Sequence, residues 1–197
     1  MKHAYRRIMA LLLASILLIG TALTAEAASR EQERQELREK NASILQKLYQ
    51  ENPEAQSAVE NSYGYAVLHN TGIKVGIFGS AHGRGIAVNN RTGKEVFMKM
   101  EEQSAGLGLG VKEYALVFVM EDEGAWNAFA SGDGWKGGTE AGAAATDGYA
   151  GGGVAGASFV SRGLWVYQIT TKGIALEASI KGTKFYPNKK LNDYSKD

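Results

Sequence analysis

From Tyr63 onward the chain alternates short apolar runs with turns rich in glycine and asparagine, which restricts its fold more than any other feature. The runs are 65–69, 75–78, 85–88, 95–98, 114–119, 154–160, 164–169 and 174–180. Short, closely spaced runs with Gly and Asn between them are typical of antiparallel β-structure. The pattern predicts an α+β domain that is mostly an antiparallel sandwich or barrel-like sheet. One internal helix is expected at 121–131, with Ala125, Trp126 and Phe129 on one face.

Glycine is about twice as frequent here as the average of about 7%, with 25 glycines but only two prolines. A disordered Pro/Gly linker is therefore excluded. Gly106, Gly108 and Gly110 alternate within a predicted strand pattern, so that one face of it lacks side chains. Such a face permits tight packing or the close approach of another surface, and tight packing is favoured.

Two helices are predicted before the strands. Residues 29–50 place Leu37, Ile44 and Leu48 at helical spacing, and Pro53 suits the first turn of a second helix at 53–61. Acidic and basic residues alternate along the first helix, whereas a helix lying on a membrane is rich in Lys and Arg on its polar face. We therefore expect the first helix to dock on the β domain.

The first 27 residues have the layout of a secretory signal peptide. Lys2, Arg6 and Arg7 precede an apolar run at 8–23, and residues 25–27 (Ala-Glu-Ala) provide a small-x-small cleavage site. The alternative is a membrane anchor, because the run approaches the roughly 18–20 residues that cross a bilayer. The cleavage motif favours removal. The expected organisation is a signal peptide at 1–27, a helical segment at 28–61 and a glycine-rich β domain at 62–197.

Charge and cysteine content narrow the class of protein. The signal peptide contains three basic residues and one acid, so the full chain's charge of +1 becomes −1 after cleavage. A near-neutral domain argues against broad nucleic-acid binding. The chain has no cysteine, yet 170 residues bury an adequate core without disulfides. These features favour a bacterial-type protein of the periplasm or cell envelope.

An enzyme is disfavoured because catalytic combinations are missing. His69 and His82 are the histidines left after cleavage, and neither stands in a known nucleophile or metal motif. They are expected at a strand end and in a glycine turn, respectively. The glycine stretches at 79–85 and 106–110 lack the features that bind phosphate or dinucleotides. We expect no catalytic residue, metal or cofactor.

Basic and aromatic residues gather late in the chain. Trp135 and Lys136 follow a glycine turn, and a cluster near the end contains Lys181, Lys184, Phe185, Tyr186, Lys189 and Lys190. Trp and Tyr beside Lys suit the headgroup region of a membrane. A solvated tail with a buried Trp is the alternative, which composition alone slightly favours.

Several segments, in this order, resemble the SYLF domain. They are 61–69 (NSYGYAVLH), 74–79 (KVGIFG), 83–85 (GRG), 103–110 (QSAGLGLG), 129–138 (FASGDGWKGG) and 173–184 (GIALEASIKGTK). The resemblance covers about residues 45–195. It implies a non-enzymatic lipid-binding module, because eukaryotic members bind phosphoinositides, some associate with actin, and bacterial exported members are described as phospholipid-associated. Lys181 and residues 140–142 (Glu-Ala-Gly) depart from the family pattern, which puts any family ligand contact there in doubt.

Two functions follow as expectations. The first is peripheral binding to a phospholipid membrane surface through Lys74, Arg84, Trp135, Lys136 and Lys184. The second is a protein-interaction or envelope-scaffold domain, with envelope proteins as partners and no affinity for lipid. An enzyme that depends on His69 or His82 ranks third, and nucleic acid is not an expected partner.

Overall fold

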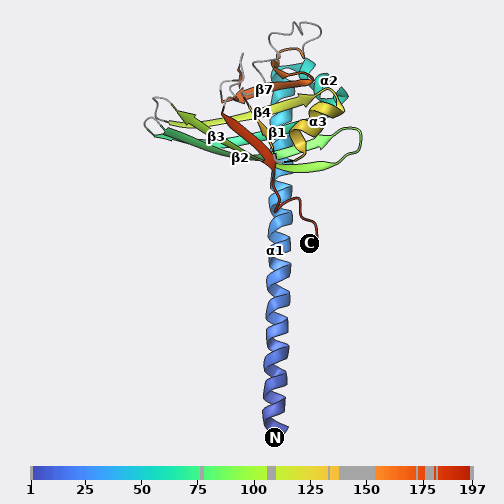
Figure 1. Cartoon of the computed structure of the whole chain (residues 1–197), viewed down its shortest axis with the longest axis vertical. Coiled ribbons are helices and arrows are strands. Elements are labelled where there is room, and N and C mark those ends of the chain that lie inside the picture. Colours follow the sequence, from blue (N-terminus) through green and yellow to red (C-terminus); the bar gives the residue numbers. More distant parts are fainter. Residues whose placement is uncertain are drawn as a thin grey trace.

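Three helices and nine strands make up the described part of the chain in the computed structural model (Figure 1). The structure describes residues 2–75, 78–105, 110–132, 134–137, 154–171, 173–175, 180 and 182–195. Within these, it describes only the backbone of residues 2–25, 71–75, 78–81, 103–105 and 110–112. The helices are α1 (Lys2–Glu51), α2 (Pro53–Asn61) and α3 (Glu123–Ala130). The strands are β1 (Gly64–Val75), β2 (Phe78–Asn89), β3 (Glu95–Ala105), β4 (Gly110–Met120), β5 (Trp135–Lys136), β6 (Ser158–Ser161), β7 (Leu164–Thr170), β8 (Gly173–Ile174) and β9 (Thr183–Pro187).

All nine strands belong to one antiparallel sheet that curls into a half-barrel. Its order is β5-β9-β3-β2-β1-β4-β7-β6, and β8 also pairs with β7. The four long strands β1 to β4 form its centre, with register pairs such as His69↔Arg84 and Arg84↔Lys99. The predicted α+β class and barrel-like sheet are therefore confirmed.

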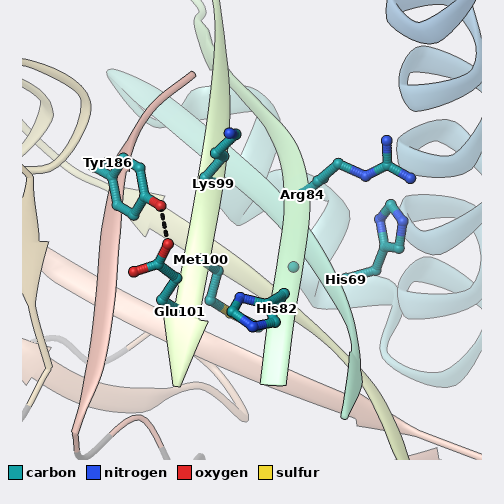
Figure 2. Close-up of a pocket in the computed structure, with 8 residues that line it drawn as sticks. His69, His82, Arg84, Lys99, Met100, Glu101 and Tyr186 are labelled. Atoms are coloured by element: carbon teal, nitrogen blue, oxygen red, sulfur yellow. Dashed lines mark hydrogen bonds between the residues drawn. The ribbon is translucent and has the colours of Figure 1, made fainter. Parts of the chain in front are cut away.

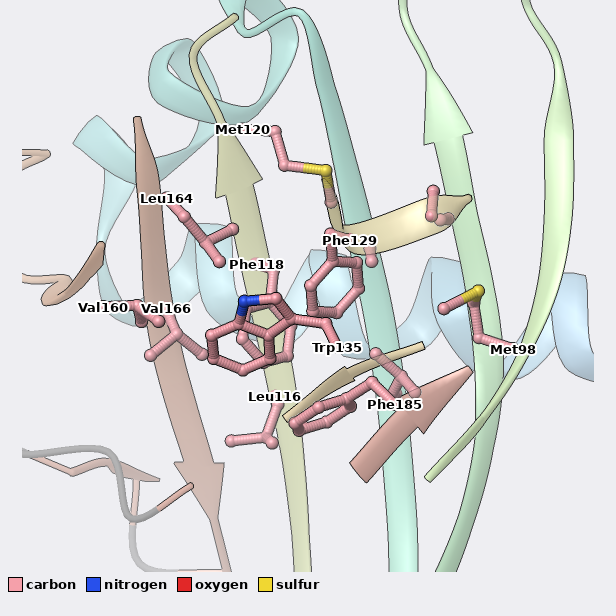
Figure 3. Close-up of a cluster of buried hydrophobic side chains, with 14 of the residues drawn as sticks. Met98, Leu116, Phe118, Met120, Phe129, Trp135, Val160, Leu164, Val166 and Phe185 are labelled. Carbon is pink, nitrogen blue, oxygen red and sulfur yellow. The ribbon is translucent and has the colours of Figure 1, made fainter. Parts of the chain in front are cut away.

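Both faces of the sheet are covered, as Figure 1 shows, with α1 on one face and α3 on the other. We call these the α1 face and the α3 face. On the α3 face an aromatic cluster fills the core, with ring centroids 4.5–6.3 Å apart (Figure 3). The cluster consists of Phe118, Phe129, Trp135 and Phe185. These large apolar rings account for much of the buried apolar surface that stabilises this face.

On the α1 face, α1 lies across the sheet. Leu37, Ile44 and Leu48 are buried against strand residues such as Ile86 and Val117, which confirms the predicted docking. The C-terminal segment covers the same helix: Arg34, 1% exposed, donates to the Leu191 carbonyl at 3.0 Å. Among the residues described with side chains, no helix is long and apolar enough to cross a bilayer.

Gly85 in β2 shows why glycine is needed inside a strand. A Cβ on Gly85 would lie 1.8 Å from the Val67 carbonyl oxygen of β1, and one on Gly83 would lie 2.6 Å from the His69 carbonyl oxygen. Side chains at these positions would push the two backbones apart. Close approach of strands is thus a role of these glycines.

Several sequence predictions need correction. Residues 70–72 and 82–85 were expected as turns, but β1 and β2 continue through them. β9 was not predicted, because its residues were assigned to the basic-aromatic tail. The expected helices at 53–61 and 121–131 are confirmed as α2 and α3, and α1 extends the helix expected at 29–50. Of the alternating glycines, Gly110 begins β4, whereas Gly106 and Gly108 lie outside the described residues.

Candidate functional site

A row of polar side chains crosses the α1 face, on strands β1, β2, β3 and β9. Register pairing aligns His69, Arg84, Lys99 and Tyr186 across these four strands. Side chains alternate between the two faces of a strand. Since the neighbouring Val67, Ile86 and Phe97 pack on the α1 side, the polar row lies on that side as well.

This row borders a pocket of about 390 Å³. Figure 2 shows its labelled side chains, which come from four strands: β1, β2, β3 and β9. The lining residues are His69, His82, Gly83, Arg84, Lys99, Met100, Glu101 and Tyr186. The pocket thus combines Arg84 and Lys99 with two imidazoles and a phenol, groups that bind anionic oxygen atoms well, and with the carboxylate of Glu101.

Two acids near the pocket are already bonded to pocket side chains. Glu33 of α1 accepts from Arg84 at 2.7 Å, and Glu101 accepts from the Tyr186 hydroxyl. Burial and this hydrogen bond raise the pKa of Tyr186 to about 12, so the phenol stays protonated at neutral pH. Among the described residues, no acid lies within ion-pair distance of Lys99 or of Lys40 on α1.

His69 lies where two pockets meet. It lines the first pocket and a second one of about 260 Å³ that is bordered by Lys40, Lys47 and Glu113. Burial, and then the positive charges of Lys40 and Arg84, lower the pKa of His69 to about 4, so its imidazole is neutral at pH 7. Its buried Nδ1 has no hydrogen-bond partner among the described residues.

Both histidines lie elsewhere than predicted from the sequence. His69 was expected at a strand end, but it lies in the middle of β1 with a half-buried side chain. His82 was expected in a glycine turn and instead lies within β2, where it is opposite Glu101 of β3 in the strand register. The cause is the uninterrupted β2, since the flanking glycines allow close strand approach and do not form a turn.

The proposed lipid-binding residues are divided between surface and core. Arg84 lines the pocket, and Lys184 lies on the same face with its Nζ 5.3 Å from the Tyr186 ring centroid. Lys136 is exposed and pairs in register with Lys184. Trp135 is 5% exposed and packs in the aromatic core, away from the surface.

Lys74 lies near the end of β1, opposite Gly79 and Gly110, and its side chain is not described. Lys181 and residues 140–142, the departures from the family pattern, lie outside the described residues.

Lys40 and Lys99 were not predicted as members of the site, and Tyr186 was predicted only as part of the basic-aromatic cluster near the C-terminus. Their common signal was strand or helix periodicity: Lys99 alternates with the apolar Met98 and Met100, and Lys40 lies between the buried Leu37 and Ile44. Lys99 and Tyr186 lie beside Arg84 because β3 pairs with both β2 and β9, and this strand pairing could not be predicted from the sequence.

Comparison with known proteins identifies the family. The family described as "Ysc84: Las17-binding protein actin regulator" matches residues 101–195. A curated relative, Beta cell expansion factor A of Aeromonas veronii, is 33% identical over 154 residues, or 78% of this chain. The aligned part covers 57% of that relative, so the chain spans little more than half of its length. Through residues 101–195, this chain belongs to the Ysc84 family, the family of the SYLF domain.

Proposed function

We propose that this domain is a non-enzymatic module that binds peripherally to anionic phospholipid membranes, using the α1 face of β1, β2, β3 and β9. The observation that carries the proposal is the pocket in which Arg84 and Lys99 lie next to two histidines. Family membership supports a lipid- or actin-related binding module. Phospholipid is the ligand that matches both.

The charge of the central hairpin supports the same choice. Residues 61–94, which include β1 and β2, contain no Asp or Glu but four cations: Lys74, Arg84, Arg91 and Lys94. Lys136 and Lys184 add two cations on β5 and β9, which β3 separates from the hairpin. A basic residue close to an anionic membrane contributes about 1 kcal/mol of attraction.

The test is co-sedimentation of the full chain with vesicles of phosphatidylcholine, with and without phosphatidylglycerol. The double variant Arg84→Glu/Lys99→Glu should bind the anionic vesicles at least tenfold more weakly than the unmodified chain. Arg162→Glu, an exposed charge reversal in the β6–β7 turn, is the matched control and should bind within twofold. Equal binding by all three chains would refute the proposed surface.

A protein-interaction or envelope-scaffold domain is the alternative. Recovery of a stoichiometric protein partner, together with no vesicle binding under any salt condition, would favour it.

We also propose that the chain is exported and cleaved after Ala27. A docked contact that lies beyond the cleavage site supports this, because Arg30 is buried and donates to the Asp193 carbonyl at 3.4 Å. Cleavage would therefore leave the docked part of α1 intact. N-terminal sequencing of the secreted or periplasmic protein should begin at Ala28; an intact Met1 would contradict cleavage.

A further inference from the structure

The pocket on the α1 face contains a histidine, His69, that electrostatic attraction to an anionic membrane does not require. Its most buried ionisable group, His69, is neutral and lies beside cations. Arg84 approaches it from β2 and Lys40 from α1, and both positive charges disfavour the imidazolium. Figure 2 shows the His69 ring beside the guanidinium end of Arg84.

Glu33 offsets part of the charge of Arg84, whereas Lys40 has no ion-pair partner among the described residues. Glu33 bonds to Arg84 and Glu101 to Tyr186, while Lys47 bonds to the Thr170 carbonyl at 2.8 Å and lies 3.8 Å from Glu51. Glu113 borders the second pocket together with His69. The charged or titratable groups that line the two pockets with His69 are Lys40, Lys47, Arg84, His82, Lys99, Glu101, Glu113, Tyr114 and Tyr186, and Glu33 is bonded to Arg84.

An anion would supply the missing negative charge. The guanidinium of Arg84 has five N–H donors, of which Nη1 carries the ion pair with Glu33, so other donors remain for a second oxygen ligand. Lys99 is exposed and, in the described part of the chain, has no acid partner. Arg forks are suited to the tetrahedral oxygens of phosphate, and Lys adds a point charge.

We propose that this pocket seats one phosphate-type anion between Arg84 and Lys99, and that seating the anion brings a proton onto His69. The anion neutralises the field of Lys40 and Arg84 and gives the imidazolium a partner, so binding and protonation favour each other. Acid therefore strengthens binding. This inference rests on the proposed function in that the anion at a membrane is a lipid headgroup, although a free phosphate would have the same chemistry.

The coupling between proton uptake and anion binding sets how strongly the affinity for the anion depends on pH. A proton that is taken up with the anion increases affinity by up to tenfold for each unit fall in pH, as long as His69 is neutral in the free protein and charged in the complex. Between pH 7.5 and 5.5 we expect at least a fivefold tightening.

The first test uses sulfate, because it remains a dianion across this pH range and its own titration adds nothing. Calorimetric titration of the full chain should show the fivefold tightening, and His69→Gln should reduce it to less than twofold. The same pH dependence in His69→Gln would overturn the proton link. No sulfate binding at either pH would overturn the anion seat.

A second measurement covers the case in which His69→Gln does not fold. The ring resonance of His69 in the unmodified chain should titrate at least one pH unit higher with saturating sulfate than without it. An unchanged midpoint would overturn the link.

Vesicles separate this inference from the proposed function. Binding to phosphatidylglycerol vesicles without any sulfate binding would refute the seat and leave membrane binding intact. Sulfate binding that is linked to His69, without vesicle binding, would refute the membrane function and identify a site for free phosphate.

Discussion

Among single residues, Gly85 has the strictest steric requirement of the glycines described in the sheet. Ala at this position would place its Cβ 1.8 Å from the Val67 carbonyl oxygen, which forces β1 and β2 apart. We expect Gly85→Ala to destabilise the protein by about 3 kcal/mol or more, at or above the upper end for overpacking.

Chemical denaturation would measure this difference. Gly93→Ala is a suitable control because a Cβ there has no atom within 4 Å, and only the positive φ of 70° costs energy. It should lose about 1 kcal/mol. Equal losses for the two variants would show that β1 and β2 can separate easily.

His69 gives a prediction for acid stability without any ligand. Its pKa is about 4 in the folded chain and about 6.5 when unfolded. Between these values the unfolded chain binds more protons, so the stability present above pH 6.5 is lost as the pH falls towards 4.

His69→Gln should therefore lose less stability between pH 7 and pH 4.5 than the unmodified chain. Denaturant midpoints at the two pH values would show this. Parallel losses would mean that His69 is not held neutral by its surroundings.

At the scale of elements, the C-terminal segment fastens α1 to the sheet. Arg34 donates to the Leu191 carbonyl at 3.0 Å and lies 4.1 Å from the Tyr194 ring centroid. Arg34→Met keeps most of the volume but leaves the carbonyl without this donor, which should cost about 1–3 kcal/mol.

Thermal or denaturant unfolding would test this fastening. Gln35→Met, an exposed change on the same helix, is the control and should stay within about 0.5 kcal/mol. If the two variants were equally stable, the C-terminal segment would not hold α1.

The helices were predicted correctly where apolar residues recur at helical spacing. Trp126 and Phe129 indicated α3 correctly, and Leu37 with Leu48 indicated the docked face of α1. β1 and β2 were predicted too short because Gly83 and Gly85 are signals for turns as well as for close strand packing. Only long-range pairing distinguishes the two, and the same pairing brings Lys99 and Tyr186 to His69.

For the whole molecule, the two faces of the sheet differ in what they offer a partner. The α3 face is closed by an aromatic core that includes Trp135, so the tryptophan predicted at a membrane interface stabilises the fold. The α1 face has the polar row, which begins beside α1 at His69 and Arg84 and continues to Lys99 and Tyr186 on β3 and β9. We therefore propose that the membrane is contacted by the α1 face.

Residue-specific labelling tests this assignment directly, because the chain has no cysteine and each introduced Cys is unique. A nitroxide at Lys99→Cys should lose collisions with a water-soluble relaxation agent when anionic vesicles are added. A nitroxide at Asn127→Cys, exposed on α3, should keep them. Protection of residue 127 with continued exposure of residue 99 would contradict the account and assign the membrane to the α3 face.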